Sequence, residues 1–219
     1  MNESSCEDLE STLHEPASIV RVAVSFEASL VLVALGLGYW LQQPAWQNLP
    51  GATLWDTVLA AGVGLLAAVP MLGMLVVTRR LAWGPVRRLC QLVDEQLLPL
   101  FANASLAGLL LLSLAAGFGE EMLFRGVLQD WLANRLGGDV GPWVALVLVS
   151  LLFGLCHWLT TAYAVFAFLI GLYLGVVYWI SDSLLSVVVA HAAYDFVALL
   201  WLLRPAVVAR DEDKKSGGP

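Results

Sequence analysis

Long apolar runs are the feature that most constrains how this chain can fold. A helix needs about 20 apolar residues to cross a bilayer, and the 219-residue chain contains six candidate runs: Val22–Leu41, Thr57–Val77, Ser105–Phe118, Trp143–Trp158, Tyr163–Ile180 and Leu184–Leu203. With 59% hydrophobic and 13% charged residues, the chain is also far more apolar than a soluble domain. We therefore expect an all-α protein, a polytopic membrane helix bundle with about six transmembrane helices.

The segments around these runs divide the chain into four parts: a polar acidic tail (1–18), two transmembrane helices with a linker (19–104), a core rich in polar motifs (105–203) and a second polar tail (204–219). The stretch 79–101 within the linker is amphipathic, which predicts a helix lying at the membrane interface. Because the N-terminal residues lack a basic start followed by an apolar run, we expect no cleaved signal peptide.

The distribution of charge predicts an orientation in the membrane. The formal net charge is −7, but five of the 18 acidic residues lie within 1–18, so the acidity says little about a ligand. No basic patch interleaved with aromatic residues is present, which argues against nucleic acid as a partner. With six spans, nine of the 11 Lys and Arg residues fall on one side, so the positive-inside rule places both termini in the cytoplasm.

Ionisable residues inside apolar runs are candidates for function, because each costs about 2.5–3.5 kcal/mol at the centre of a membrane helix. They concentrate in the second half of the chain: Glu120, Glu121 and Arg125 after the third run, His157 at the end of the fourth, and His191 and Asp195 within the sixth. In the first half only Glu27 is comparable, near the start of the first run. We interpret Glu27 as structural, reaching the interface or bonding to a neighbour.

Helical spacing predicts which of these residues act together, since residues four apart share a face. Glu121 and Arg125 form such a pair and suit a buried salt bridge, whereas Glu120 points about 100° away and serves a different purpose. The pairs Phe153 with His157 and His191 with Asp195 repeat the spacing on two further helices.

Peptide hydrolysis would use such a group of residues. The reaction needs an activated water, a group that holds the oxyanion and a proton donor for the leaving amine. Three carboxylates, from Glu120, Glu121 and Asp195, face one guanidinium, from Arg125, so the group has an excess of two negative charges. Either a proton on a carboxylate or a bound cation would relieve this excess, and charge counting leaves both open.

Other intramembrane chemistries fit the sequence less well. The chain has no GxSG-like serine nucleophile and no HExxH zinc signature, and Asp195 has no second intramembrane Asp with which to form a diaspartyl pair. Two classes besides a protease remain: a non-catalytic membrane protein that uses the polar cavity for binding or scaffolding, and a proton or ion carrier.

The three motifs, taken in order, resemble those of the CPBP family, named for CAAX proteases and bacteriocin-processing proteins. Glu120–Arg125 reads EExxxR, Phe153–His157 reads FxxxH, and His191–Asp195 reads HxxxD, over roughly residues 105–203. The resemblance implies an intramembrane endopeptidase related to the type II CAAX prenyl endopeptidase. It also implies a peptide or protein substrate in or near the lipid bilayer, in a prokaryotic plasma (inner) membrane.

The resemblance also implies roles for the motif residues. Glu120 would activate a water together with His157, and His191 and Asp195 would hold the oxyanion. Many relatives carry Asn at the last position, and an anionic Asp cannot donate a hydrogen bond, so we expect Asp195 to orient His191 instead. The remaining motif residues would support the site: Glu121, Arg125 and Phe153.

The metal content stays open at this point, because the family has been described both as metal-dependent and as glutamate-based. We favour no cofactor, since the candidate ligands come singly from three helices. The alternative is Zn²⁺ held by Glu120, His157 and His191.

A plain zigzag of six helices would separate the motifs in depth. At 1.5 Å per residue, Glu120 and His157 would lie roughly 14 Å apart along the membrane normal. The motifs can meet only if the third helix tilts or begins late, or if the chain folds back within Gly126–Gly141.

Overall fold

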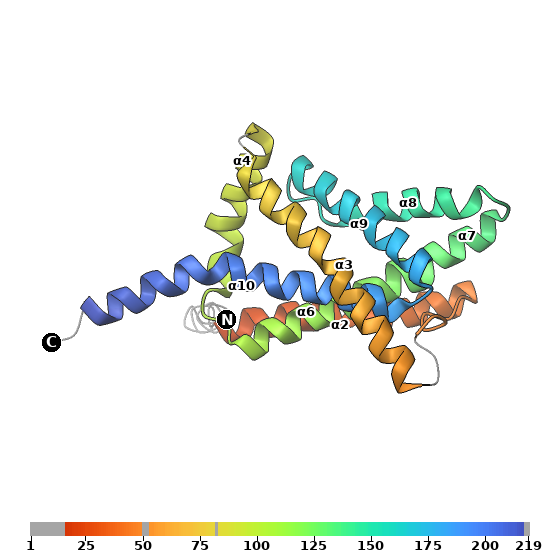
Figure 1. Cartoon of the computed structure of the whole chain (residues 1–219), viewed down its shortest axis with the longest axis horizontal. Coiled ribbons are helices and arrows are strands. Elements are labelled where there is room, and N and C mark those ends of the chain that lie inside the picture. Colours follow the sequence, from red (N-terminus) through yellow and green to blue (C-terminus); the bar gives the residue numbers. More distant parts are fainter. Residues whose placement is uncertain (1–15, 50–52, 82, 217–219) are drawn as a thin grey trace, which may run out of the picture.

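The fold was described from a computed structural model, which covers residues 16–49, 53–81 and 83–216. Every regular element in these ranges is a helix (Figure 1). In chain order they are α2 (Pro16–Leu41), α3 (Leu54–Arg80), α4 (Gly84–Leu92), η1 (Val93–Leu97), α5 (Leu98–Phe101), α6 (Leu106–Glu121), η2 (Met122–Gln129), α7 (Asp130–Leu136), α8 (Gly141–Cys156), α9 (Thr161–Ser181) and α10 (Leu184–Ser216). The expected all-α bundle is confirmed, while most of the acidic tail 1–18 lies outside the described residues.

Five helical stretches are long and apolar enough to cross a membrane: Ile19–Leu41, Leu54–Arg80, Leu106–Leu136, Thr161–Ser181 and Leu184–Arg204. The sixth expected span is the 16-residue helix α8, which reaches only about 24 Å and is shorter than the hydrocarbon core. The amphipathic stretch 79–101 forms α4, η1 and α5, as its pattern predicts. Helix α10 continues past residue 203, where we placed a domain boundary.

Hydroxyl side chains set the start of three helices. Thr53 Oγ1 accepts a hydrogen bond from the amide of Asp56 at the start of α3, and Ser105 Oγ accepts one from Gly108 at the start of α6. Thr160 Oγ1 does the same for Tyr163 at the start of α9. Each cap satisfies an amide that has no partner within its helix, so these helices begin where the sequence changes from polar to apolar.

A helical hairpin brings Glu120 and His157 together, which a plain zigzag of six helices would not do. Helices α6, η2 and α7 form one continuous stretch, and the chain then reverses so that α8 runs back beside α7 (Figure 1). Gly137 and Gly138 make the reversal with φ angles of 64° and 61°, a region in which glycine carries no steric penalty. Glu120 lies 16 residues before the end of α7, and His157 lies 16 residues after the start of α8. The two arms have equal length, so both side chains lie at the same depth.

The exposed surface of the helices is apolar, as a bilayer requires. On α3, Leu66 and Val69 are 73% and 61% exposed, whereas Gly64 and Ala67 on the opposite face are buried. Small residues therefore face the neighbouring helices and large ones face outward, which is the arrangement expected of a helix packed in lipid. The protein is a multi-pass membrane protein.

Candidate active site

The three motifs meet at one cavity. It has a volume of about 490 Å³ and is lined by residues from the first, middle and last parts of the chain. All four residues to which the motif resemblance assigns catalysis are in its wall: Glu120, His157, His191 and Asp195. The rest of the wall is mainly apolar, with leucines from α4, α5 and α10. The folded chain thus brings together side chains from three separate helices around a space in which a peptide could bind.

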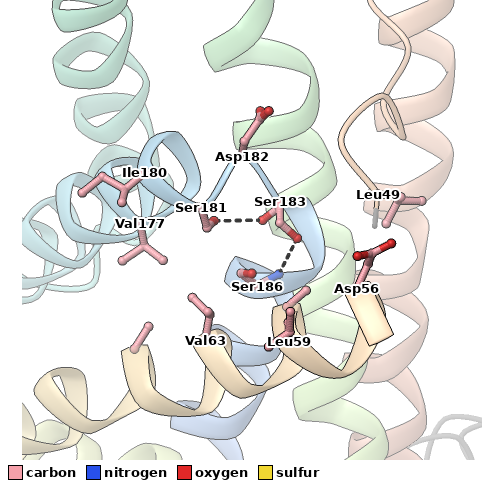
Figure 2. Close-up of a pocket in the computed structure, with 12 residues that line it drawn as sticks. Leu49, Asp56, Leu59, Val63, Val177, Ile180, Ser181, Asp182, Ser183 and Ser186 are labelled. Atoms are coloured by element: carbon pink, nitrogen blue, oxygen red, sulfur yellow. Dashed lines mark hydrogen bonds between the residues drawn. The ribbon is translucent and has the colours of Figure 1, made fainter. Parts of the chain in front are cut away.

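A second cavity of about 550 Å³ lies elsewhere and contains none of the motif residues. Figure 2 shows its walls, formed by Leu59 and Val63 of α3, Val177 and Ile180 of α9, and the turn that leads into α10. Its polar residues are two aspartates and three serines, without a histidine. The candidate active site is therefore the motif-lined cavity.

Glu120 and His157 face each other across this cavity. The distance between Glu120 Oε2 and His157 Nε2 is 3.7 Å. Glu120 is 7% exposed, and its Oε2 has no hydrogen-bond partner in the structure. His157 Nδ1 lies 2.8 Å from the carbonyl oxygen of Phe153; because a carbonyl can only accept, Nδ1 carries the proton. Neutral His157 therefore directs the lone pair of Nε2 toward the Glu120 carboxylate.

The aromatic ring of Phe153 contacts three polar side chains of the motifs. The imidazole of His157 lies against it at 4.4 Å between centroids, and the guanidinium carbon of Arg125 lies 4.9 Å from the ring centre. His191 approaches the ring edge-on at 6.2 Å. The supporting role implied for Phe153 therefore has a structural basis, and it includes a cation–π contact that helical spacing alone did not indicate.

Glu121, Arg125 and His191 form a buried ionic cluster, which we call the brace. Arg125 Nη1 donates to Glu121 Oε1 at 2.7 Å, as the spacing of the pair predicts, and its Nη2 donates to the carbonyl oxygen of Gly171 on α9 at 3.0 Å. His191 Nδ1 lies 2.7 Å from the same Glu121 oxygen. Glu121 and Arg125 are 0% and 1% exposed. The Glu121 carboxylate thus joins α6 to η2 and α10, and Arg125 extends the cluster to α9.

His191 has a second carboxylate partner besides Asp195, the residue that we expected to orient it. The short contact of its ring is with Glu121, whereas Asp195 Oδ2 lies 3.5 Å from Nε2 on the cavity side. Helical spacing indicates Asp195 as a partner of His191 because both are on the same helix. It cannot indicate Glu121, which is on a different helix that packs alongside. Both ring nitrogens of His191 therefore face carboxylates, an arrangement that favours the doubly protonated imidazolium.

Close packing of α6 against α10 makes the Glu121–His191 contact possible. A Cβ atom on Gly117 would lie 2.9 Å from both the amide nitrogen of Ala192 and the carbonyl oxygen of Val188. Only glycine lets the two backbones approach so closely. The glycine is one helical turn before Glu121, and Ala192 directly follows His191.

Two residues that line the cavity were not assigned to the site from the sequence. Glu27 of α2 lines it, and its buried Oε2 has no hydrogen-bond partner, whereas the structural role that we assign to Glu27 stays a prediction. Tyr163 at the start of α9 also lines it, with its ring 6.0 Å from that of His157. The sequence offered a signal for Glu27, because a carboxylate within an apolar run is unusual. It offered no comparable signal for Tyr163.

The zinc alternative, with Glu120, His157 and His191 as ligands, stays a prediction. His191 Nδ1 lies 2.7 Å from Glu121 Oε1, and its Nε2 lies 3.5 Å from Asp195 Oδ2. Among the described residues, no three His, Cys, Asp or Glu side chains are grouped as a metal ion requires.

Comparison with known proteins bears on the segment that carries all three motifs. Residues 102–197 match the Rce1-like family model, that of type II CAAX prenyl endopeptidases. The match confirms the resemblance that the motifs indicate and supports a membrane protease. No curated protein and no solved structure matches the chain. The Rce1-like segment contains the brace, Glu120 and His157, whereas α2 with Glu27 lies outside it.

Proposed function

We propose that this protein is an intramembrane endopeptidase that hydrolyses a peptide bond with a water activated by Glu120 and His157. The observation that carries the proposal is the 3.7 Å approach of Glu120 Oε2 and His157 Nε2 at the wall of the cavity. Two acceptors at this separation can both receive hydrogen bonds from one water molecule, since each lies within hydrogen-bond reach of a common point. Such a water is polarised for attack.

The steps of the reaction follow from these positions. The water attacks the scissile carbonyl carbon, and its proton passes to the Glu120 carboxylate. The imidazolium of His191, held by Glu121, stabilises the oxyanion of the tetrahedral intermediate. When the carbon–nitrogen bond breaks, Glu120 returns the proton to the leaving amine. Asp195 keeps His191 charged from the other side of its ring.

We propose that this chemistry proceeds without a metal ion. The support is the geometry of His191, whose two nitrogens are both committed to carboxylates. A positively charged His191 also offsets part of the negative charge of the site, which reduces the need for a cation. Glutamate activation of water then uses only residues that the cavity already holds.

The substrate that the family description suggests is a prenylated CAAX peptide, and this is the first substrate to test. The apolar walls of the cavity would suit it, and they would also suit other peptides that enter from the membrane. We further propose that both termini are cytoplasmic, in a prokaryotic plasma membrane, because the basic residues that flank the spans favour that side.

The decisive experiment is cleavage of a peptide library, including prenylated CAAX peptides, by protein purified in detergent. We expect the wild type to cleave and Glu120→Gln to be inactive while folding normally. Glu95→Gln is the matched control, since Glu95 is exposed and outside the cavity. Retained turnover in Glu120→Gln would overturn the assignment of the base. Absence of cleavage by the wild type in every arm would favour a binding protein or a carrier.

A further inference from the structure

Glu27 is a half-buried carboxylate that the proposed mechanism does not use. It lines the same cavity as Glu120, His157 and Asp195, and its Oε2 is shielded from solvent without any hydrogen-bond partner. A carboxylate in an apolar run costs several kcal/mol unless something pairs with it. Helix α2 is outside the Rce1-like segment, so Glu27 is not among the residues that the family match covers.

Packing of α2 against α6 fixes the position of Glu27 beside the catalytic carboxylate. A Cβ atom on Gly119 would clash with the carbonyl oxygen of Glu27, and its next neighbour would be Leu30 of the same helix. The backbone of α2 therefore lies directly against α6, one residue before Glu120. The charges of Glu27 and Glu120 are close enough to interact, so Glu27 belongs to the catalytic end of the cavity.

The side chains that line the cavity include few positive charges. Among the described residues that line it, Arg79 is the only Lys or Arg, and its guanidinium is bound to Asp94 at 2.8 Å. Arg125 belongs to the brace and contacts Glu121. His191 lies between Glu121 and Asp195. Glu120 thus has His157 beside it and Asp195 has His191, whereas among the described residues no basic group forms an ion pair with Glu27.

We propose that Glu27 is a specificity residue that binds a cationic group of the substrate, the side chain of a Lys or Arg near the scissile bond. An ammonium or guanidinium donates charge-assisted hydrogen bonds to a carboxylate, and in a largely apolar cavity this pairing is stronger than in water. A neutral peptide would leave the Glu27 oxygen without a donor, so binding would discriminate against it. The inference rests on the proposed function, because the cation is part of the cleaved peptide.

The test compares two libraries that are identical except that one contains lysine where the other contains norleucine, an uncharged side chain of similar length. We expect the wild type to prefer the lysine library by about tenfold or more in kcat/KM, the effect of one charged hydrogen bond. Glu27→Gln should lose this preference through a higher KM for the lysine peptides, so that its kcat/KM becomes the same for the two libraries. Glu95→Gln, an exposed carboxylate with the same substitution, should behave as the wild type.

A purely structural role of Glu27 gives a different result. It would lower the activity on both libraries equally and reduce the melting temperature, and that outcome would overturn the proposal. An unchanged lysine preference in Glu27→Gln would overturn it as well. If Glu27→Gln folds poorly, Glu27→Leu, which is apolar and suits a membrane helix, provides the same comparison.

A binding measurement separates this inference from the proposed function. In the Glu120→Gln background, the lysine peptides should bind about tenfold more tightly than the norleucine peptides, and adding Glu27→Gln should remove the difference. If the wild type cleaves nothing while binding still selects the lysine peptides through Glu27, the inference is supported and the protease function is contradicted. Cleavage without a lysine preference would do the reverse.

Discussion

Two adjacent carboxylates of the same helix have opposite environments. Glu121 is fully buried, and its Oε1 receives hydrogen bonds from Arg125 and His191 at 2.7 Å each. Glu120 has an unpartnered Oε2 directed at a cavity, with His157 Nε2 at 3.7 Å. Glu121 Oε2 has no partner either, so the difference lies in Glu121 Oε1, which Arg125 and His191 hold in place. Glu120 instead lines the cavity, where its carboxylate is available for chemistry. Glu121 thus belongs to the brace, whereas Glu120 forms the catalytic pair with His157.

Removing Arg125 should break the brace and produce the largest effect. Arg125→Ala leaves the Glu121 carboxylate buried without its guanidinium, and losing one partner of such a pair typically destabilises by about 3–5 kcal/mol. We expect a lower folded yield, a lower melting temperature in detergent, and loss of activity. A normal melting temperature for Arg125→Ala would show that the brace is not structural.

Removing His157 should affect the catalytic pair alone. His157→Gln withdraws the lone pair that faces Glu120, and loss of a general base typically lowers the rate by about 10²–10⁴-fold. Because the side chain of His157 is 25% exposed and outside the brace, the melting temperature should remain that of the wild type. Equal losses of stability in His157→Gln and Arg125→Ala would remove the distinction between the two regions.

The approach of α6 and α10 can be perturbed at its closest point. Gly117→Ala places a methyl group 2.9 Å from the backbone of α10, and overpacking of this kind costs about 1–3 kcal/mol. Gly36→Ala on α2 is the matched control, since nothing lies within 4 Å of the added carbon. Thermal melting of the two variants should show destabilisation only for Gly117→Ala, together with reduced activity as Glu121 and His191 separate.

Phe153 links the two regions and should give a smaller effect. Phe153→Leu keeps an apolar side chain but removes the aromatic face under Arg125, a contact worth about 0.5–2 kcal/mol. We expect a modest fall in melting temperature and a partial loss of activity. Unchanged values for both would mean that the ring does not position either His157 or Arg125.

Metal removal should produce no effect. Dialysis against a strong chelator is expected to leave the cleavage rate unchanged, because both nitrogens of His191 face carboxylates. Elemental analysis of the active protein is the direct check. One zinc per chain, with activity lost on stripping and restored by zinc alone, would replace the glutamate mechanism by a metal mechanism.

The local pattern of the sequence predicted the helices and the pairs within them. Apolar length identified the membrane spans, and the four-residue spacing identified the Glu121–Arg125 bridge, because both depend on the geometry of a single helix. The opposite directions of Glu120 and Glu121 also follow from that geometry. These features need no knowledge of which helices are neighbours.

Only the tertiary structure decided which residues of different helices meet. The reversal at Gly137 and Gly138 gives the hairpin arms equal length and brings His157 level with Glu120. Contact of α6 with α10 adds Glu121 to Asp195 as a partner of His191, and contact of α6 with α2 adds Glu27 to the cavity. Helical periodicity carries no information on these contacts, because they depend on where the chain turns and on where a missing side chain lets two backbones touch.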